Sequence, residues 1–580
     1  MEYNVTPGEI QGAAPLHGEK FFSMLAAART MLTHQVPGDM HTSLQPDEGT
    51  MITSAAEQRG VRIVLALLLV ATVVALYGPL VRFPFVQDDW RVIHRFVFGR
   101  APSVIAEILS PAGKFFYRPL AGIYFYGVYR VFGLNAAGFH ILSLIVLAGS
   151  SLLVAALGRA LTGDRVVAWG SAFLFAAAAN VQFEPQMWMV GSFDTGAVLF
   201  SLLSLLALLR GRFGLSALAM GGALACKESA ALLAVVAAAW MFIRGDVRRI
   251  AGKLKWHAAL FALFLAVKLA GVSLFALPAT DPYAARLTGA HILAHGELYG
   301  TWAIQAVTPL KNVLFTEGES RAVVLLALGA IALAALGAPL FSARRGFRGG
   351  SSTRAGLCAA AWMFLMIVPP LTLRGHVVTY YLAPALPGLA IGTMLALATA
   401  ARVVSRGRRS ALVFCALLAA ACTVDGLIMV QKRMALGLAD GAHATSRDGD
   451  DHLIRKGTVV AQTRAALGAI LPSMPSHTLL VMEGVETGCF GGRYGLQVWY
   501  GDSTLMLAET PALPEGGGRV RATLAPEASS EPITVSVPAD SVICVRAEGG
   551  RMVLVRDIPG APSPAGPTGA PSAPSVRKGE

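Results

Sequence analysis

Long apolar runs recur along this chain from Val61 to Val430, and short polar segments separate them. A run of about 20 apolar residues is long enough to cross the hydrocarbon core of a bilayer. The pattern therefore predicts an all-α polytopic membrane protein. Its about eleven transmembrane helices lie at residues 61–80, 136–158, 166–180, 193–209, 214–226, 229–243, 257–277, 321–341, 355–372, 378–400 and 410–430.

Two of the segments between the predicted helices are long, at residues 81–135 and 278–320. Basic residues gather in other, shorter segments, which are expected on the opposite side of the membrane. Arginine clusters follow every second predicted helix, at residues 159–165, 210–212, 244–255, 344–354 and 402–409. Because basic loops stay in the cytoplasm, both long segments are expected outside. Within the first of them, residues 120–132 are apolar and aromatic enough to form an amphipathic helix along the interface.

The two ends of the chain have a different pattern. Residues 1–60 read as a polar cytoplasmic extension in which Met51 is an alternative start, and 61–80 reads as an uncleaved anchor because no signal-peptide pattern precedes it. After the transmembrane domain at 61–430, residues 431–557 predict a small soluble α+β periplasmic domain. It is helical over 431–472 and has strands at 478–482, 496–500, 533–537 and 552–555. The Pro-, Ala-, Gly- and Ser-rich tail at 558–580 is expected to be disordered.

Composition and charge agree with this class of protein. The chain is 54% hydrophobic and 14% charged, whereas soluble domains carry about 25% charged residues. The net charge of +13 comes mostly from the short basic loops, so it reports topology and does not indicate nucleic-acid binding. The expected location is the inner (plasma) membrane of bacterial type, with a cytoplasmic N-terminus.

The six cysteines fall into two groups. Four lie in apolar runs and are expected to be small core residues, namely Cys226, Cys358, Cys415 and Cys422. Cys489 and Cys544 lie in the outer C-terminal region, where an oxidising compartment would let them form a disulfide or leave them as free thiols.

Polar residues that can carry chemistry collect on the outer side in this topology. Ionisable groups at membrane depth are costly, so each is a functional candidate. The set consists of Asp88, Asp89, Arg118, His140, Glu184, Asp194, Lys227, Glu228, Arg374, His376 and Tyr381. We expect these side chains to meet near the outer membrane surface.

Most of these residues also have a structural interpretation. Asp88 and Asp89 can cap a helix, act as a general base, or bind a divalent cation such as Mg or Mn. Arg118 can snorkel at the interface or bind a phosphate. His140 can be a packed, hydrogen-bonded histidine.

The remaining candidates divide in the same way. Lys227 and Glu228 can neutralise each other, or the lysine can face a lipid phosphate. Glu184 can be an ordinary loop residue. The segment with Arg374, His376 and Tyr381 can anchor the chain in the aromatic belt. The sequence contains no Walker glycine loop, GxSxG, HExxH or CxxC motif.

In their order and spacing these residues resemble the GT-C superfamily of membrane glycosyltransferases, near the protein O-mannosyltransferases and the TMTC-type enzymes. The resemblance covers about residues 60–400. It rests on Asp88-Asp89, on Arg118-Pro119-Leu120, on Asn135, Phe139, His140 and Ile141, on Glu184, Trp188, Gly191 and Asp194, on Lys227-Glu228, and on Tyr380-Tyr381-Leu382-Ala383-Pro384. The chain departs from the family at two positions ahead of Glu184: family members have histidines there, and this chain has Ala179 and Gln182. It also lacks the tetratricopeptide repeats of the TMTC-type enzymes.

The resemblance implies transfer of a sugar from a polyprenyl-phosphate donor to a hydroxyl acceptor on a protein, lipid or glycan. Asp88 or Asp89 would be the general base, and Arg118, Lys227 and Arg374 would hold the carrier phosphate. An inverting single displacement is also implied.

Two other functions fit the pattern. One is a transporter or flippase of a lipid-linked saccharide, which would show broken helices in repeated halves. The other is a non-catalytic assembly factor that binds through its soluble tail, for which Asp88 and Asp89 would be dispensable.

Overall fold

The structure is a computed structural model, and it describes residues 55–112, 114, 116–245, 250–271, 281, 283–308, 350–405, 408–439, 452–509, 513–516, 518–524, 533–548 and 551–555. Three predicted features lie outside the described residues. They are most of the extension at 1–60, the helix at 321–341 and the tail at 558–580.

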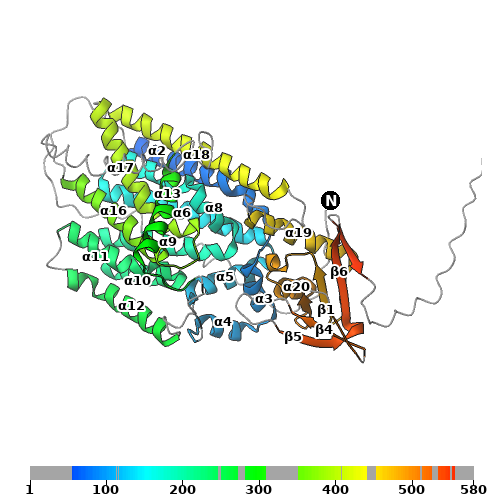
Figure 1. Ribbon diagram of the computed structural model, residues 1–580. Helices are drawn as coiled ribbons and strands as arrows, with labels where there is room; N and C mark the ends of the chain where they lie inside the picture. The colour runs from blue at the N-terminus through cyan, green and yellow to red at the C-terminus, as the bar shows by residue number, and fades with distance from the viewer. Residues whose placement is uncertain are drawn as a thin grey trace, which may run out of the picture. The chain divides into compact units, whose positions relative to one another are not determined.

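Helices make up most of the described chain (Figure 1). In order they are α2 (Ala55–Tyr77), η1 (Gly78–Arg82), α3 (Asp88–Phe98), α4 (Ala101–Leu109), α5 (Pro119–Phe132), α6 (Ala136–Thr162), α7 (Arg165–Ala177), α8 (Ala179–Met187), η2 (Met189–Gly191), α9 (Ser192–Leu209), α10 (Phe213–Cys226), η3 (Glu228–Leu232), α11 (Leu233–Ile243), α12 (Ile250–Gly271), α13 (Gly289–Val307), α16 (Gly350–Leu371), η5 (Thr379–Leu382), α17 (Leu386–Ser405), α18 (Arg408–Ala439), α19 (His452–Ile470), η6 (Thr487–Phe490), α20 (Arg493–Tyr500) and η7 (Ala539–Ser541).

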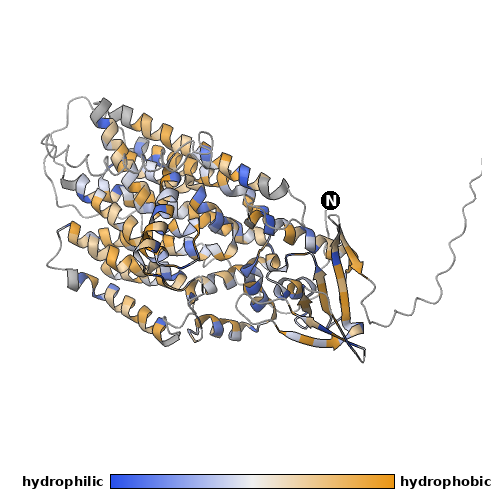
Figure 2. Ribbon diagram, in the orientation of Figure 1, coloured by the Kyte–Doolittle hydropathy of each residue, from blue (hydrophilic) through white to orange (hydrophobic). Residues whose placement is uncertain are grey.

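Hydrophobic residues dominate the long helices (Figure 2), and the prediction of a polytopic membrane protein is confirmed. Among the described residues, five segments are long and apolar enough to span a membrane, and the bent pair α7–α8 makes a sixth if it is one span. The five are Gln58–Arg82, Ala136–Thr162, Met189–Leu209, Ser352–Leu371 and Leu412–Ala435. Three shorter apolar segments coincide with predicted helices, at Phe213–Cys226, Glu228–Ile243 and Leu386–Arg402.

The first long outer segment is more helical than expected. The predicted interfacial helix at 120–132 is present as α5, but α3 and α4 also lie in the stretch that the sequence reading left as loop. Helix α3 is amphipathic and buries Trp90, Ile93 and Phe96. Its apolar residues are too few to stand out beside the membrane runs, so the hydropathy pattern does not reveal it. Likewise, α13 lies in the predicted loop at 278–320.

The predicted helix at 166–180 breaks at Ala178, and α8 leaves α7 at an angle of 56°. Breaking a helix frees carbonyl groups at the end of its first half. One of these is satisfied by the Tyr77 hydroxyl, which donates to the Ala176 carbonyl over 2.9 Å. The new direction places α8 against η5, α13 and α18.

The C-terminal region contains two sheets. Strands β1 (Leu479–Glu483), β2 (Met506–Ala508), β6 (Val542–Glu548) and β7 (Arg551–Val555) form one in the order β2-β1-β6-β7, with β1 parallel to both neighbours. Strands β3 (Leu513–Gly516), β4 (Arg519–Thr523) and β5 (Thr534–Pro538) form an antiparallel sheet. The strand predicted at 496–500 is wrong, because these residues belong to α20, which ends at Gly501 in the left-handed conformation (φ 67°).

Of the two alternatives left open for Cys489 and Cys544, the structure has the free thiols. All six cysteines are free and buried. Cys489 lies in η6 and Cys544 in β6, and they belong to different hydrophobic clusters, so packing separates the two thiols. Burial raises the pKa of the Cys489 thiol to about 12.

The described residues from Arg59 onward belong to one compact unit. A single hydrophobic cluster continues from the apolar helices into the C-terminal region, where it includes Leu480, Phe490 and Leu496. Helix α18 also runs through the expected domain boundary at 430/431.

Candidate active site

Four of the candidate residues form two ion pairs. The Arg118 guanidinium donates to both carboxylate oxygens of Glu228, over 2.9 and 2.8 Å. The Lys227 ammonium donates to both oxygens of Asp194, each over 2.5 Å. Lys227 and Glu228 therefore do not neutralise each other but pair with different partners.

The backbone explains this crossed pairing. Lys227 ends α10 in an extended conformation (φ −158°, ψ 140°), and Glu228 begins η3. Consecutive side chains on extended backbone point in opposite directions. Lys227 thus reaches Asp194 in the first turn of α9, while Glu228 reaches Arg118 at the start of α5.

Aromatic rings surround both cations. The Lys227 Nζ lies 5.0 Å from the ring centroids of Tyr380 and Tyr381. The Arg118 Cζ lies 4.6 Å from the centroid of Phe116 and 5.6 Å from that of Phe193. Such positions stabilise a cation through the ring quadrupole.

Lys268 of α12 adds a third cation whose charge acts on Glu228. Arg118 and Lys227 each pair with one carboxylate, and the charge of Lys268 also acts on Glu228. We call Arg118, Asp194, Lys227, Glu228 and Lys268 the ion cluster.

A histidine and a tyrosine line the same region. The His376 ring lies 4.5 Å from that of Tyr283 and 5.5 Å from that of Tyr381. Burial lowers the pKa of His376, and the Lys227 charge lowers it further, which favours the neutral ring. Its buried Nδ1 has no hydrogen-bond partner among the residues that the structure describes.

Tyr283 was missed by the sequence reading. It is brought to the site by backbone hydrogen bonds that join residues 284–286 to 372–374, including Arg374 N–H to the Ala284 carbonyl over 3.0 Å. No local pattern signals a pairing between segments so far apart. The Arg374 side chain itself is exposed.

The adjacent aspartates are in different environments. Asp89 is fully buried and accepts hydrogen bonds from the backbone N–H groups of Val86 (3.1 Å), Met189 (3.4 Å) and Val190 (3.0 Å). Burial raises the pKa of Asp89 to about 8, and the three hydrogen bonds oppose this rise. Asp88 is exposed at the start of α3.

The charge of Asp88 acts on Tyr283 and on His376. Burial raises the pKa of Tyr283 to about 12, and the Asp88 carboxylate adds to the rise. Asp88 also opposes the lowering of the pKa of His376. An exposed carboxylate is a side chain that can accept a proton from a hydroxyl.

The cation site at Asp88 and Asp89 stays a prediction. The Asp89 oxygens already accept three backbone N–H hydrogen bonds. Within the described ranges, no group of three or more His, Cys, Asp and Glu residues could hold a metal ion.

The other two candidates, His140 and Glu184, contact residues outside the ion cluster. The buried His140 ring lies between two carbonyl groups, with Nδ1 2.9 Å from the Gln186 oxygen and Nε2 3.0 Å from the Phe83 oxygen. This arrangement fits the structural interpretation, in which His140 links α6 to two other segments. Glu184 of α8 pairs with Arg433 of α18 over 3.4 Å.

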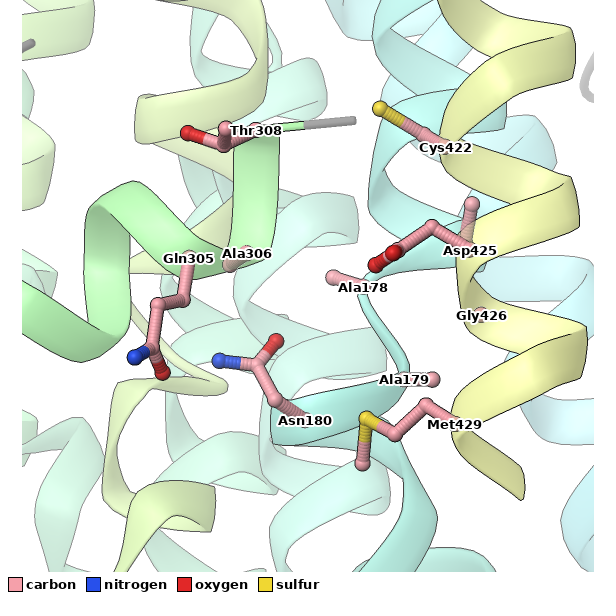
Figure 3. A pocket seen from close by; sticks show the side chains of 11 residues that line it. Ala178, Ala179, Asn180, Gln305, Ala306, Thr308, Cys422, Asp425, Gly426 and Met429 are labelled. Carbon is pink, nitrogen blue, oxygen red and sulfur yellow. The ribbon is translucent and has the colours of Figure 1, made fainter. Parts of the chain in front are cut away.

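A small polar cavity lies at the break between α7 and α8 (Figure 3). Asn180 of α8 and Asp425 of α18 point into it. Its volume of about 10 Å³ is close to that of one water molecule. The break in a span is therefore accompanied by polar side chains, away from the ion cluster.

No protein-family model matches the chain, and no curated protein sequence matches it. Among solved structures, the chain is similar to ArnT from Cupriavidus metallidurans bound to undecaprenyl phosphate, with 13% identity, coverage of 79% of this chain and 87% of that chain, and a TM-score of 0.43. It is also similar to the oligosaccharyltransferase of Archaeoglobus fulgidus in the apo form, with 13% identity, coverage of 75% and 63%, and a TM-score of 0.40.

Proposed function

We propose that this protein is a membrane glycosyltransferase that moves a sugar from a polyprenyl-phosphate carrier to a hydroxyl acceptor. The observation that carries the proposal is the exposed carboxylate of Asp88 together with two cations at the ends of apolar helices, Arg118 and Lys227, each paired with a carboxylate. The motifs shared with the GT-C superfamily supply the substrate class.

The chemistry divides between the two parts of the site. Asp88 accepts the proton of the acceptor hydroxyl, which makes its oxygen a stronger nucleophile. The oxygen attacks the anomeric carbon, and the bond from that carbon to the carrier phosphate breaks. The Arg118 guanidinium and the Lys227 ammonium stabilise the negative charge of the departing phosphate.

Other residues have supporting roles in this proposal. His376 offers its unpartnered Nδ1 to a sugar hydroxyl, beside Tyr283 and Tyr381. Asp89 and His140 hold the surrounding backbone and do not touch the substrate. The apolar surface of the helices accommodates the prenyl chain in the bilayer.

The test is transfer from a panel of radiolabelled polyprenyl-phosphate sugars by the purified protein and by its Asp88→Asn variant. Loss of a general base lowers rates by about 10²–10⁴-fold, and we expect kcat to fall in this range with an unchanged melting temperature. Asp540→Asn, which changes an exposed aspartate in η7, is the matched control and should keep full activity. Full transfer by Asp88→Asn would exclude this mechanism.

A transporter or flippase of a lipid-linked saccharide is the second candidate. The observation that favours it is the broken span α7–α8 with Asn180 and Asp425 at the break, because broken helices are typical of transporter binding sites. The same preparation in liposomes would then move the labelled lipid between leaflets without forming a new glycosidic bond.

A further inference from the structure

The backbone immediately before Asp88 has an unusual conformation. Gln87 has φ 49° and ψ −117°, a region that residues with a side chain rarely adopt. Such strain persists only where the surroundings enforce it. Contacts that hold Gln87 in this conformation therefore also fix the position of Asp88, the next residue.

The C-terminal region supplies one contact directly to Gln87. The Gln87 N–H donates to the Cys489 carbonyl in η6 over 2.8 Å. Two residues later, Gly491 packs so closely that a Cβ atom there would lie 2.8 Å from the Gln87 carbonyl oxygen and 3.2 Å from the Trp90 Cβ. Only a residue without a side chain allows this approach.

A second glycine contacts the other end of the same segment. In α19, a Cβ atom on Gly457 would lie 2.1 Å from the Phe83 ring. Phe83 is buried, and its carbonyl is the one that faces His140. The segment at 83–90 is thus held between the C-terminal region and α6.

Aromatic packing reinforces the arrangement. Trp90 is buried, its indole N–H donates to the Phe85 carbonyl over 2.8 Å, and its ring packs edge-on against Trp499 at 5.6 Å. Trp499 in turn packs on Phe490, at 4.8 Å between ring centroids. The contact between the C-terminal region and the Asp88 segment is therefore built largely from packed aromatic rings.

We propose that the C-terminal region positions the catalytic carboxylate. Gly457 and the Cys489–Gly491 turn are positioning residues that keep Gln87 in its strained conformation and thereby fix Asp88. The inference rests on the proposed function, in which Asp88 is the general base. It makes the C-terminal region a part of the active site.

The chain offers matched glycine controls. Gly491 and Gly501 are both helix C-caps in the left-handed conformation, with φ 69° and 67°, but nothing lies within 4 Å of a Cβ atom on Gly501. Gly457 and Gly468 both lie in α19, and nothing lies within 4 Å of a Cβ atom on Gly468. Within each pair, replacing glycine by alanine has the same effect on the backbone conformation. The two members differ only in whether the added Cβ atom would clash with a neighbouring segment.

The experiment compares Gly491→Ala with Gly501→Ala, and Gly457→Ala with Gly468→Ala, in the full-length protein. A displacement of about 1 Å at a catalytic group costs up to about 100-fold in rate. We expect kcat to fall 10- to 100-fold in Gly491→Ala and Gly457→Ala with KM for the donor within about twofold of wild type. The two controls should keep the wild-type kcat.

Hydrogen–deuterium exchange of residues 83–90 gives a readout that needs no substrate. Exchange at the Gln87 amide should rise in Gly491→Ala and stay low in Gly501→Ala. Unchanged exchange, or raised exchange with an unchanged kcat, would overturn the positioning role. An inactive wild type that still shows the exchange difference would locate the failure in the proposed function instead.

Discussion

At the scale of single residues, burial separates side chains of the same chemistry. Asp88 and Asp89 are adjacent in the sequence, yet one is exposed and the other accepts three backbone hydrogen bonds in the interior. Two of those donors, Met189 and Val190, belong to the segment just before α9. Asp89 therefore ties the Asp88 segment to the helix that carries Asp194.

The protonation of Asp89 leads to a pH prediction. Burial raises its pKa from an ordinary value near 4 to about 8. Between these values the folded protein binds the proton and the unfolded chain does not, so stability should fall as pH rises from about 4 to 8. The Asp89→Asn variant has no proton to lose at this position, so its stability should not show this fall. The melting temperature of the wild type should therefore drop relative to that of Asp89→Asn as pH rises.

The comparison needs only a pH series in one detergent. The contribution is at most about 1.4 kcal/mol per pH unit within that window. A constant difference between the two proteins from pH 5 to pH 9 would mean that the three N–H bonds outweigh burial and keep Asp89 ionised throughout.

The identity of many site residues could be predicted from the sequence, because ionisable groups are rare in an apolar chain. Their partners could not. Whether Lys227 pairs with Glu228 or Asp194 depends on the extended backbone at a single residue. Tyr283 reaches the site only through a pairing with residues some 90 positions away, which no spacing rule reveals.

At the scale of elements, the approach of η2 to α8 depends on one glycine. A Cβ atom on Gly191 would lie 2.6 Å from the Pro185 Cα and 2.9 Å from its carbonyl oxygen. Because these are backbone atoms, neither can rotate away. The two N–H donors to Asp89 immediately precede this glycine.

We therefore predict that Gly191→Ala destabilises the protein by about 1–3 kcal/mol, the usual cost of overpacking. Its φ of −60° suits alanine, so the cost is steric and not conformational. Thermal unfolding measures it. Gly149→Ala in α6, where the nearest atom would be 4.0 Å away, should be neutral or slightly stabilising, and equal melting temperatures for the two variants would contradict the close packing.

Long apolar runs predicted the helices of the membrane region well, whereas short apolar runs did not predict the elements of the C-terminal region reliably. The helices of the membrane region follow from hydropathy because a bilayer requires about 20 apolar residues. In the C-terminal region, residues 496–500 have the composition of a strand but form α20, since Leu496 and Val498 are buried by packing on α3 and η6. Tertiary contacts override local propensity in such short segments.

At the scale of the whole molecule, the alternation of helices and arginine clusters predicts that the C-terminal region and the candidate active site share the outer side. A reporter that is active only after export, fused after Glu580, should be active, and a cytoplasmic reporter at the same position should not. The opposite result would show that the number of spans before α19 is even and not odd, and it would move the C-terminal region inside.

The crossed ion pairs also bear on the order in which the membrane region assembles. An unpaired ionised side chain raises the cost of transferring a helix from the translocation channel into lipid. Asp194 and Lys227 neutralise each other when α9 and α10 lie side by side, so their pairing favours lateral release of the two helices as one hairpin. Arg118 and Glu228 are 110 residues apart, and their pair can close only after that hairpin has been joined to α5.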